Sequence, residues 1–130
     1  MVRQSWRRAR SARASASDRA PVWPENVRGS LSHAGDLAVA IVGHANDFQA
    51  IGLDIEPDED LPLDLLSSVL TAAERAAVAQ HADGLRAARR VFCAKEAVFK
   101  ALYPGLRRFV GFDAAQMPIL PPVRGVANVD

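Results

Sequence analysis

The 130-residue sequence has few of the residues that mark secreted, zinc-binding or membrane-spanning proteins. Its one cysteine, Cys93, excludes a disulfide within the chain, and its three histidines are scattered and form no Cys/His zinc pattern. No apolar run approaches the ~18–20 residues of a membrane span. The Arg- and Ser-rich N-terminus has no apolar core of a secretory signal. These absences indicate a protein of the reducing cytoplasm with no membrane partner.

Lysine is also scarce. Fourteen of the sixteen basic residues are arginine, and the two lysines, Lys95 and Lys100, lie five positions apart. Lysine carries a compact ammonium charge that suits a phosphate oxygen, whereas arginine carries a planar guanidinium group. The close pair therefore either arises by chance or marks a place that needs compact ammonium groups.

Composition divides the chain into three parts. Residues 1–20 hold six arginines and one aspartate among mostly Ala and Ser, which predicts a disordered arm, either a solvated tail or a contact for acidic surfaces. Residues 21–115 have room for one compact domain. The proline-rich residues 116–130 predict an irregular tail. From residue 21 onward ten basic and fourteen acidic residues give a net charge of −4, which disfavours a nucleic-acid partner.

The patterning of the middle part predicts an α+β fold in which an antiparallel sheet packs against a long helix. A buried strand at residues 37–42 and a second strand at residues 48–56 form the expected hairpin. A short helix is expected at residues 63–69. A capping-box pattern begins a helix over residues 71–82, and a helix with one apolar face is expected over residues 85–102, ended by a Pro-Gly pair.

Two carboxylates lie two positions apart in the segment Ile51-Gly52-Leu53-Asp54-Ile55-Glu56. Successive residues of an extended chain face opposite sides, so Asp54 and Glu56 share one side and are ~6.5–7 Å apart along the chain. Two carboxylates at this spacing suit a hard cation. A half-exposed strand with its polar residues in water explains the same pattern.

A second polar cluster lies in the long helix. Helical geometry places Glu96 and Lys100 one turn apart on one side, with Lys95 about 100° round the helix. An ion pair on a solvated face is one explanation. The adjoining Phe92 and Phe99 favour another, in which the charged groups lie at the rim of a packed surface.

The third element is the segment from Gly29 to His33, which reads Gly-Ser-Leu-Ser-His. Backbone amides, small hydroxyls and an imidazole just before a strand suit phosphate oxygens. A turn with a surface histidine is an equally common explanation of such a segment.

Together the three segments resemble the Sfp/EntD-type 4′-phosphopantetheinyl transferases over roughly residues 21–112. The resemblance rests on Gly-x-Asp-x-Glu followed about forty residues later by Lys-Glu-x-x-x-Lys. The Trp-Pro and Ser-Leu-Ser-His segments favour the siderophore-associated branch. Enzymes of this type are pseudo-dimers of two similar halves, so the resemblance implies a fold equal to one half of the pseudo-dimer.

The resemblance implies a metal-dependent transfer. Asp54, Glu56 and Glu96 would coordinate Mg²⁺, which also binds the pyrophosphate of coenzyme A. A serine of an apo acyl or peptidyl carrier protein would attack the β-phosphate and release 3′,5′-ADP. Glu96, or a water that it holds, would accept the serine proton, and Lys100 would be the cation on the pyrophosphate side.

The resemblance also assigns contacts to the coenzyme A phosphates. Lys95 would be a second phosphate contact beside Lys100. Ser32 and His33 would bind the nucleotide phosphates, with His33 at the 3′-phosphate and Arg28 assisting.

The chain departs from the family pattern in what precedes residue 23 and follows about residue 115, which predicts a truncated member. One alternative is therefore an inactive remnant that binds coenzyme A or a carrier protein. Another is a small nucleic-acid-binding protein that uses the arginine-rich arm. Self-association of a lone half is a further expectation.

Overall fold

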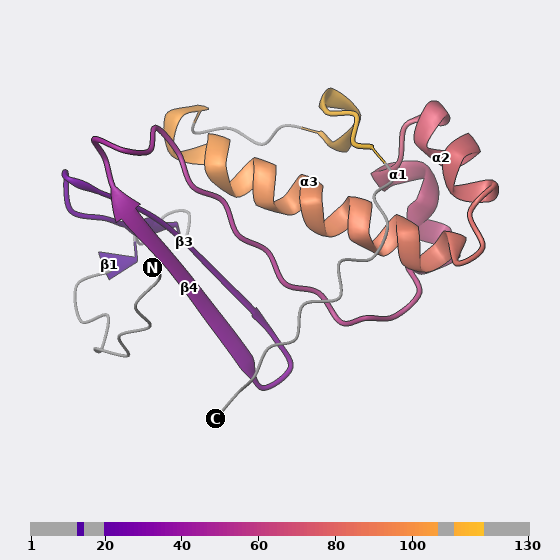
Figure 1. Ribbon diagram of the computed structural model, residues 1–130, viewed down its shortest axis with the longest axis horizontal. Helices are drawn as coiled ribbons and strands as arrows, with labels where there is room; N and C mark the ends of the chain where they lie inside the picture. The colour runs from indigo at the N-terminus through magenta and orange to yellow at the C-terminus, as the bar shows by residue number, and fades with distance from the viewer. Residues whose placement is uncertain (1–12, 15–19, 107–110, 119–130) are drawn as a thin grey trace.

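The computed structural model describes residues 13–14, 20–106 and 111–118. Over these residues the protein is an α+β structure, as predicted, with two two-stranded antiparallel sheets and one long helix (Figure 1). The elements, in chain order, are β1 (Arg13–Ala14), β2 (Pro21–Val22), β3 (Val27–Ala34), β4 (Leu37–His44), η1 (Leu63–Leu65), α1 (Leu66–Val69), α2 (Ala72–Ala79), α3 (Gly84–Leu106) and η2 (Phe112–Ala114).

The main hairpin joins β3 and β4, with Ala34 paired with Leu37 across a two-residue turn. Gly35 takes the left-handed backbone conformation (φ 55°) that such a tight turn requires. The predicted pairing of residues 37–42 with residues 48–56 is therefore wrong. The short Gly35-Asp36 turn brings β4 back onto β3, which precedes it in the chain.

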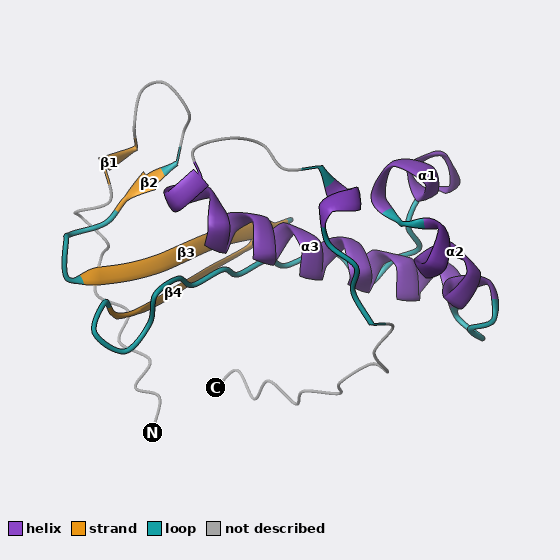
Figure 2. Ribbon diagram, turned by 90° about the horizontal axis from the view of Figure 1, so that it is seen from above, coloured by secondary structure: helices purple, strands orange, loops and turns teal. Residues whose placement is uncertain are grey.

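Residues 50–57 are extended but form no strand. Their path runs between the hairpin and α3, as Figures 1 and 2 show. The backbone amides of Leu53 and Ile55 donate to the hydroxyls of Ser30 (3.0 Å) and Ser32 (3.1 Å) on β3. Side-chain hydroxyls thus replace a backbone ladder, which is why the expected second strand is absent.

The helices follow the sequence pattern closely. In the capping box at the start of α2, Thr71 N donates to Glu74 Oε2 (2.8 Å) and Glu74 N donates to Thr71 Oγ1 (3.2 Å). The predicted short helix corresponds to η1 and α1. α3 continues through Pro104 to Leu106, beyond its predicted end.

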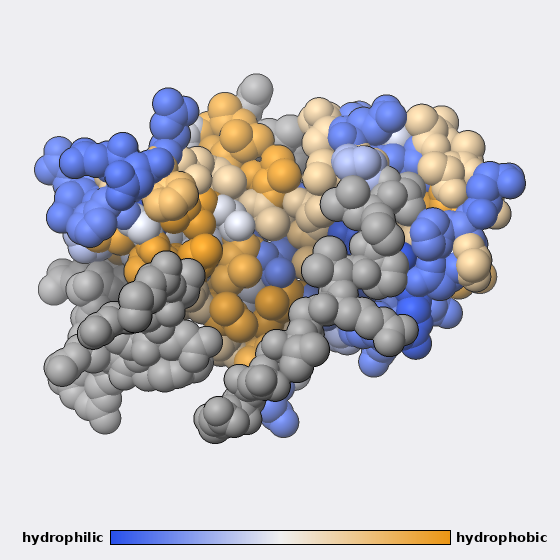
Figure 3. Space-filling view, in the orientation of Figure 1, coloured by the Kyte–Doolittle hydropathy of each residue, from blue (hydrophilic) through white to orange (hydrophobic). Residues whose placement is uncertain are grey.

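The apolar core lies where α1, α2 and α3 meet. It consists of Leu61, Val69, Leu70, Val78, Ala87, Ala88 and Val91. β4, predicted to be buried, is largely exposed: Leu37 is 58% and Val42 61% accessible. Figure 3 shows apolar surface in the middle of the molecule, between hydrophilic ends. No helix in the described ranges combines the length and apolar character needed to cross a membrane.

The first twenty residues were expected to lack structure, yet Arg13 and Ala14 form β1 and pair with Val22 and Pro21. Residues 116–118 have neither helix nor strand, and the remainder of the expected tail lies outside the described residues. The division of the chain at residues 20 and 115 stays a prediction.

Candidate functional site

Three elements meet at Asp54. Its Oδ1 accepts hydrogen bonds from Ser32 Oγ of β3 (2.9 Å) and from Lys100 Nζ of α3 (2.6 Å). Lys100 Nζ is also 3.1 Å from Ser32 Oγ. The Asp54 side chain is only 6% exposed. The fold therefore brings a carboxylate, an ammonium and a hydroxyl from distant parts of the sequence into one partly buried polar cluster.

The second carboxylate of the segment also faces α3. Glu56 Oε2 forms an ion pair with Arg89 Nη1 at 3.1 Å, and Arg89 Nη2 donates to Asp60 O at 3.0 Å. Sequence reasoning missed Arg89. Its position seven residues, or two helical turns, before Glu96 places it on the side of α3 that carries Glu96, and that spacing is a signal for its role.

Glu96 lies close enough to both carboxylates to feel their charge. Burial, followed by the negative charge of Asp54, raises the pKa of Glu96; Glu56 adds to the rise and Lys100 opposes it. The three carboxylates thus repel one another across the site. Such crowding favours a cation that neutralises them together.

The site offers oxygen donors of the kind that a hard metal ion needs. Asp54 Oδ2 is buried and has no hydrogen-bond partner in the described part of the chain, which is costly for a carboxylate oxygen. The available oxygen ligands suit Mg²⁺. However, among the described residues no three Asp, Glu, His or Cys side chains are close enough to hold a metal ion. Lys100 and Arg89 instead neutralise Asp54 and Glu56. The ligand chemistry fits Mg²⁺, but the observed arrangement is that of cation-paired carboxylates.

The other predicted contacts are dispersed. Lys95 is 3% exposed and its hydrogen-bond partners lie outside the Asp54 cluster, so its contact with a phosphate stays a prediction. His33 is exposed, and the alternation along β3 places it on the opposite face from Ser32. Arg28 donates to the carbonyls of Gln49, Glu25 and Val27 at the far end of the hairpin. Ser32 contacts Asp54 directly.

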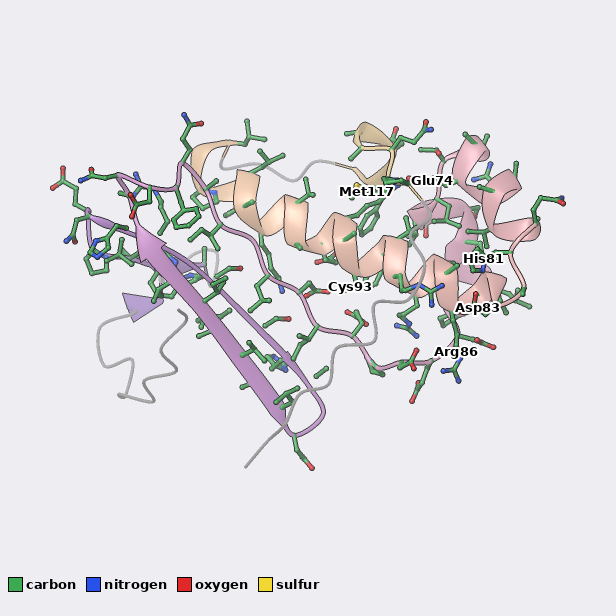
Figure 4. The ribbon with its side chains drawn as sticks, viewed as in Figure 1. Glu74, His81, Asp83, Arg86, Cys93 and Met117 are labelled. Atoms are coloured by element: carbon green, nitrogen blue, oxygen red, sulfur yellow. The ribbon has the colours of Figure 1, made fainter. Side chains whose placement is uncertain are left out.

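Cys93 lies on the side of α3 that faces the extended segment (Figure 4). Its Sγ donates to Asp54 O at 3.4 Å. Burial first, and then the charge and hydrogen bond of Asp54, raise the pKa of the thiol to about 12. The thiol therefore stays protonated at neutral pH and helps to hold the segment rather than to act as a nucleophile.

An apolar groove opens beside Glu96, between α3 and η2. It is lined by Lys95, Glu96, Val98, Phe99, Leu102, Gly111, Phe112, Ala114 and Ala115. One polar cluster and one apolar groove thus flank the same carboxylate. This arrangement suits a ligand with a charged end and a long uncharged part.

Two family models match the chain. That of the 4′-phosphopantetheinyl transferase superfamily covers residues 50–127, and that of the 4′-phosphopantetheinyl transferase N-terminal domain covers residues 2–43. The chain belongs to the 4′-phosphopantetheinyl transferase superfamily. The second match includes residues that composition assigned to a disordered arm.

Two of the similar proteins are named 4′-phosphopantetheinyl transferases, and a third is named as a component of enterobactin synthase. The chain is 41% identical over 98 residues to 4′-phosphopantetheinyl transferase Npt of Nocardia iowensis. The aligned region covers 75% of this chain and 44% of Npt. It is 37% identical over 98 residues to PptT of Mycobacterium tuberculosis, covering 75% and 43%. Enterobactin synthase component D of Escherichia coli is 38% identical over 86 residues, covering 64% and 40%. The chain thus matches less than half the length of these relatives.

Proposed function

We propose that this chain takes part in the Mg²⁺-dependent transfer of 4′-phosphopantetheine from coenzyme A to a serine of an apo acyl or peptidyl carrier protein. The observation that carries the proposal is the cluster of Asp54, Ser32 and Lys100 beside Glu96, in a chain of this superfamily. In the reaction the serine oxygen bonds to the β-phosphorus of coenzyme A. The bond from that phosphorus to the bridging oxygen breaks, and 3′,5′-ADP leaves.

Asp54, Glu56 and Glu96 would hold the metal after Asp54 and Glu56 turn from Lys100 and Arg89 toward Glu96, because the three side chains are too far apart in the observed arrangement. When bound, Mg²⁺ supplies positive charge that neutralises the pyrophosphate during the displacement. Lys100, already 2.6 Å from Asp54, is the ammonium available to a phosphate oxygen. Glu96, or a water that it holds, accepts the serine proton.

Phosphate binding by Ser32 stays a prediction, and the contacts of its hydroxyl support a positioning role as well. Its hydroxyl is used by Asp54, Lys100 and the amide of Ile55, so it orients the carboxylate and the ammonium. Phosphate binding by His33 and Arg28 stays a prediction, since neither contacts the cluster. The groove beside Glu96 would receive the pantetheine arm, whose amide and methylene groups carry no charge.

The names of the Escherichia coli and Salmonella relatives support the proposal that the modified carrier protein serves a siderophore pathway. Coenzyme A and an unpaired cysteine both suit the cytoplasm as the compartment. Self-association of the chain stays a prediction.

The test is mass spectrometry of an apo carrier protein incubated with this chain, coenzyme A and Mg²⁺. The expected result is a gain of the phosphopantetheine mass that disappears in Asp54→Ala. Asp64→Asn, which removes an exposed carboxylate in η1, is the matched control and should retain transfer. Mg²⁺-dependent coenzyme A binding without transfer would instead support a non-catalytic binder. Absence of both would contradict the proposal.

A further inference from the structure

Lys95 forms an ion pair with Glu74 in the interior, and all of its hydrogen-bond donors have acceptors. Its Nζ donates to Glu74 Oε2 (2.7 Å), to Val69 O (2.9 Å) and to Phe112 O (2.8 Å), which accounts for all three N–H groups of an ammonium. The side chains of Lys95 and Glu74 are each 2% exposed. Lys95 therefore has no donor left for a ligand.

Both oxygens of the Glu74 carboxylate also accept hydrogen bonds. Oε2 also accepts from Thr71 N, and Oε1 accepts from Met117 N at 2.6 Å. Burial by itself would raise the pKa of Glu74, but the hydrogen bonds from Lys95, Met117 and Thr71 outweigh it, and the pKa is lowered. The carboxylate thus stays ionised at neutral pH.

This network joins three regions that are far apart in the sequence: the junction between α1 and α2, the middle of α3, and the stretch from Phe112 to Met117. Figure 4 shows Glu74 and Met117 side by side where η2 approaches α1 and α2. A buried ion pair contributes little net stability compared with apolar residues of the same shape. Its distinctive effect here is geometric, because two of its bonds, to Phe112 O and from Met117 N, end on the same stretch.

That stretch is one wall of the apolar groove. Phe112, Ala114 and Ala115 line the groove opposite α3. The ring of Phe112 also packs on Phe92 of α3, with ring centroids 5.6 Å apart. Lys95 is adjacent to Glu96 in the sequence, so the residue that anchors the wall is next to the proposed base.

We propose that the Lys95–Glu74 pair is a positioning device that holds the wall of the groove and so sets the affinity for the uncharged arm of coenzyme A. The proposal rests on the proposed function for the identity of the ligand. Lys95 acts through the wall and contacts no phosphate. Its effect is therefore specific to ligands that carry the arm.

The first measurement needs no ligand. Hydrogen exchange of the full chain is compared between the wild type and the double variant Lys95→Met/Glu74→Gln, which leaves no lone buried charge. Protection of the amides from Phe112 to Met117 should fall at least ~10-fold while α3 around Val91 stays protected. Arg90→Met, which breaks a partly exposed ion pair between α3 and Asp83 just before the helix, is the control and should leave the wall unchanged. Unchanged protection of the wall in the double variant would overturn the proposal.

The second measurement compares two ligands by calorimetry with Mg²⁺. Coenzyme A carries the arm, and adenosine 3′-phosphate 5′-diphosphate has the same nucleotide and pyrophosphate without it. The double variant should bind coenzyme A about 10-fold more weakly, about 1.4 kcal/mol, with the arm-free nucleotide unaffected. Equal weakening of both, or of neither, would overturn the role of the wall. If the wild type binds neither ligand, the proposed function fails and the role in arm affinity fails with it, whereas hydrogen exchange still decides whether the pair holds the wall.

Discussion

Gly52→Ala is the substitution expected to separate the carboxylate segment from α3. A Cβ atom on Gly52 would lie 1.8 Å from Ala97 O and 2.9 Å from Ala101 Cβ. Reaching ordinary van der Waals contact of at least 3.4 Å with Ala97 O requires a displacement of about 1.6 Å. The obstacle is helix backbone, which cannot rotate away as a side chain would.

The cost follows from that geometry. Overpacking typically costs about 1–3 kcal/mol, and a collision with rigid backbone falls at about 3 kcal/mol. Displacement of the segment would also lengthen the 2.6 Å bond between Asp54 and Lys100. The variant should therefore lose both stability and the polar cluster.

Urea unfolding followed by far-UV circular dichroism measures the first loss. Gly105→Ala is the matched control, because a Cβ there meets nothing within 4 Å. Alanine at Gly105 should leave stability unchanged or raise it by up to about 1 kcal/mol. If Gly52→Ala and Gly105→Ala unfold at the same urea concentration, the close approach of the segment to α3 is refuted.

Three further predictions concern single side chains. Thr71→Ala removes the cap of α2 and should cost about 1 kcal/mol in urea unfolding, against no loss for the exposed Ser67→Ala. Cys93, with a pKa of about 12, should resist iodoacetamide at mildly alkaline pH in the folded protein and react rapidly in urea; equal rates would contradict its burial. Because the pKa of Glu74 is lowered from 4.5, its ionised form adds stability above that pH that is lost as the pH falls through the folded value. Glu74→Gln should thus flatten the acid dependence of the urea midpoint, and parallel curves would contradict this.

Helices were the easier part to predict because their signals are local. The side chains of Thr71 and Glu74 accept hydrogen bonds from each other's backbone amides within four residues, so the sequence alone predicts the cap. Strand pairing depends on a partner outside the segment. The apolar run of β4 looked like a buried strand, yet Val42 is 61% exposed.

The site shows the same contrast. Alternation along an extended chain places Asp54 and Glu56 toward α3 whether or not a backbone ladder forms. The deep burial of Lys95 was not predicted, because charged side chains are seldom fully buried. Lys95 lies four residues after Val91 and seven after Ala88, on the buried stripe of α3, and only its partner Glu74, twenty-one residues away, makes that burial tolerable.

The hydroxyls of Ser30 and Ser32 constrain how the carboxylate segment can vary. The two hydroxyls are two residues apart, and so are the amides of Leu53 and Ile55 that donate to them. The hydrogen bonds therefore fix the register between β3 and the segment. The hydroxyls bind backbone, so these bonds are indifferent to which side chains stand at positions 53 and 55. Inserting or deleting one residue would turn Asp54 away from Lys100. The side chains at positions 53 and 55 can therefore vary more freely than the length of the segment.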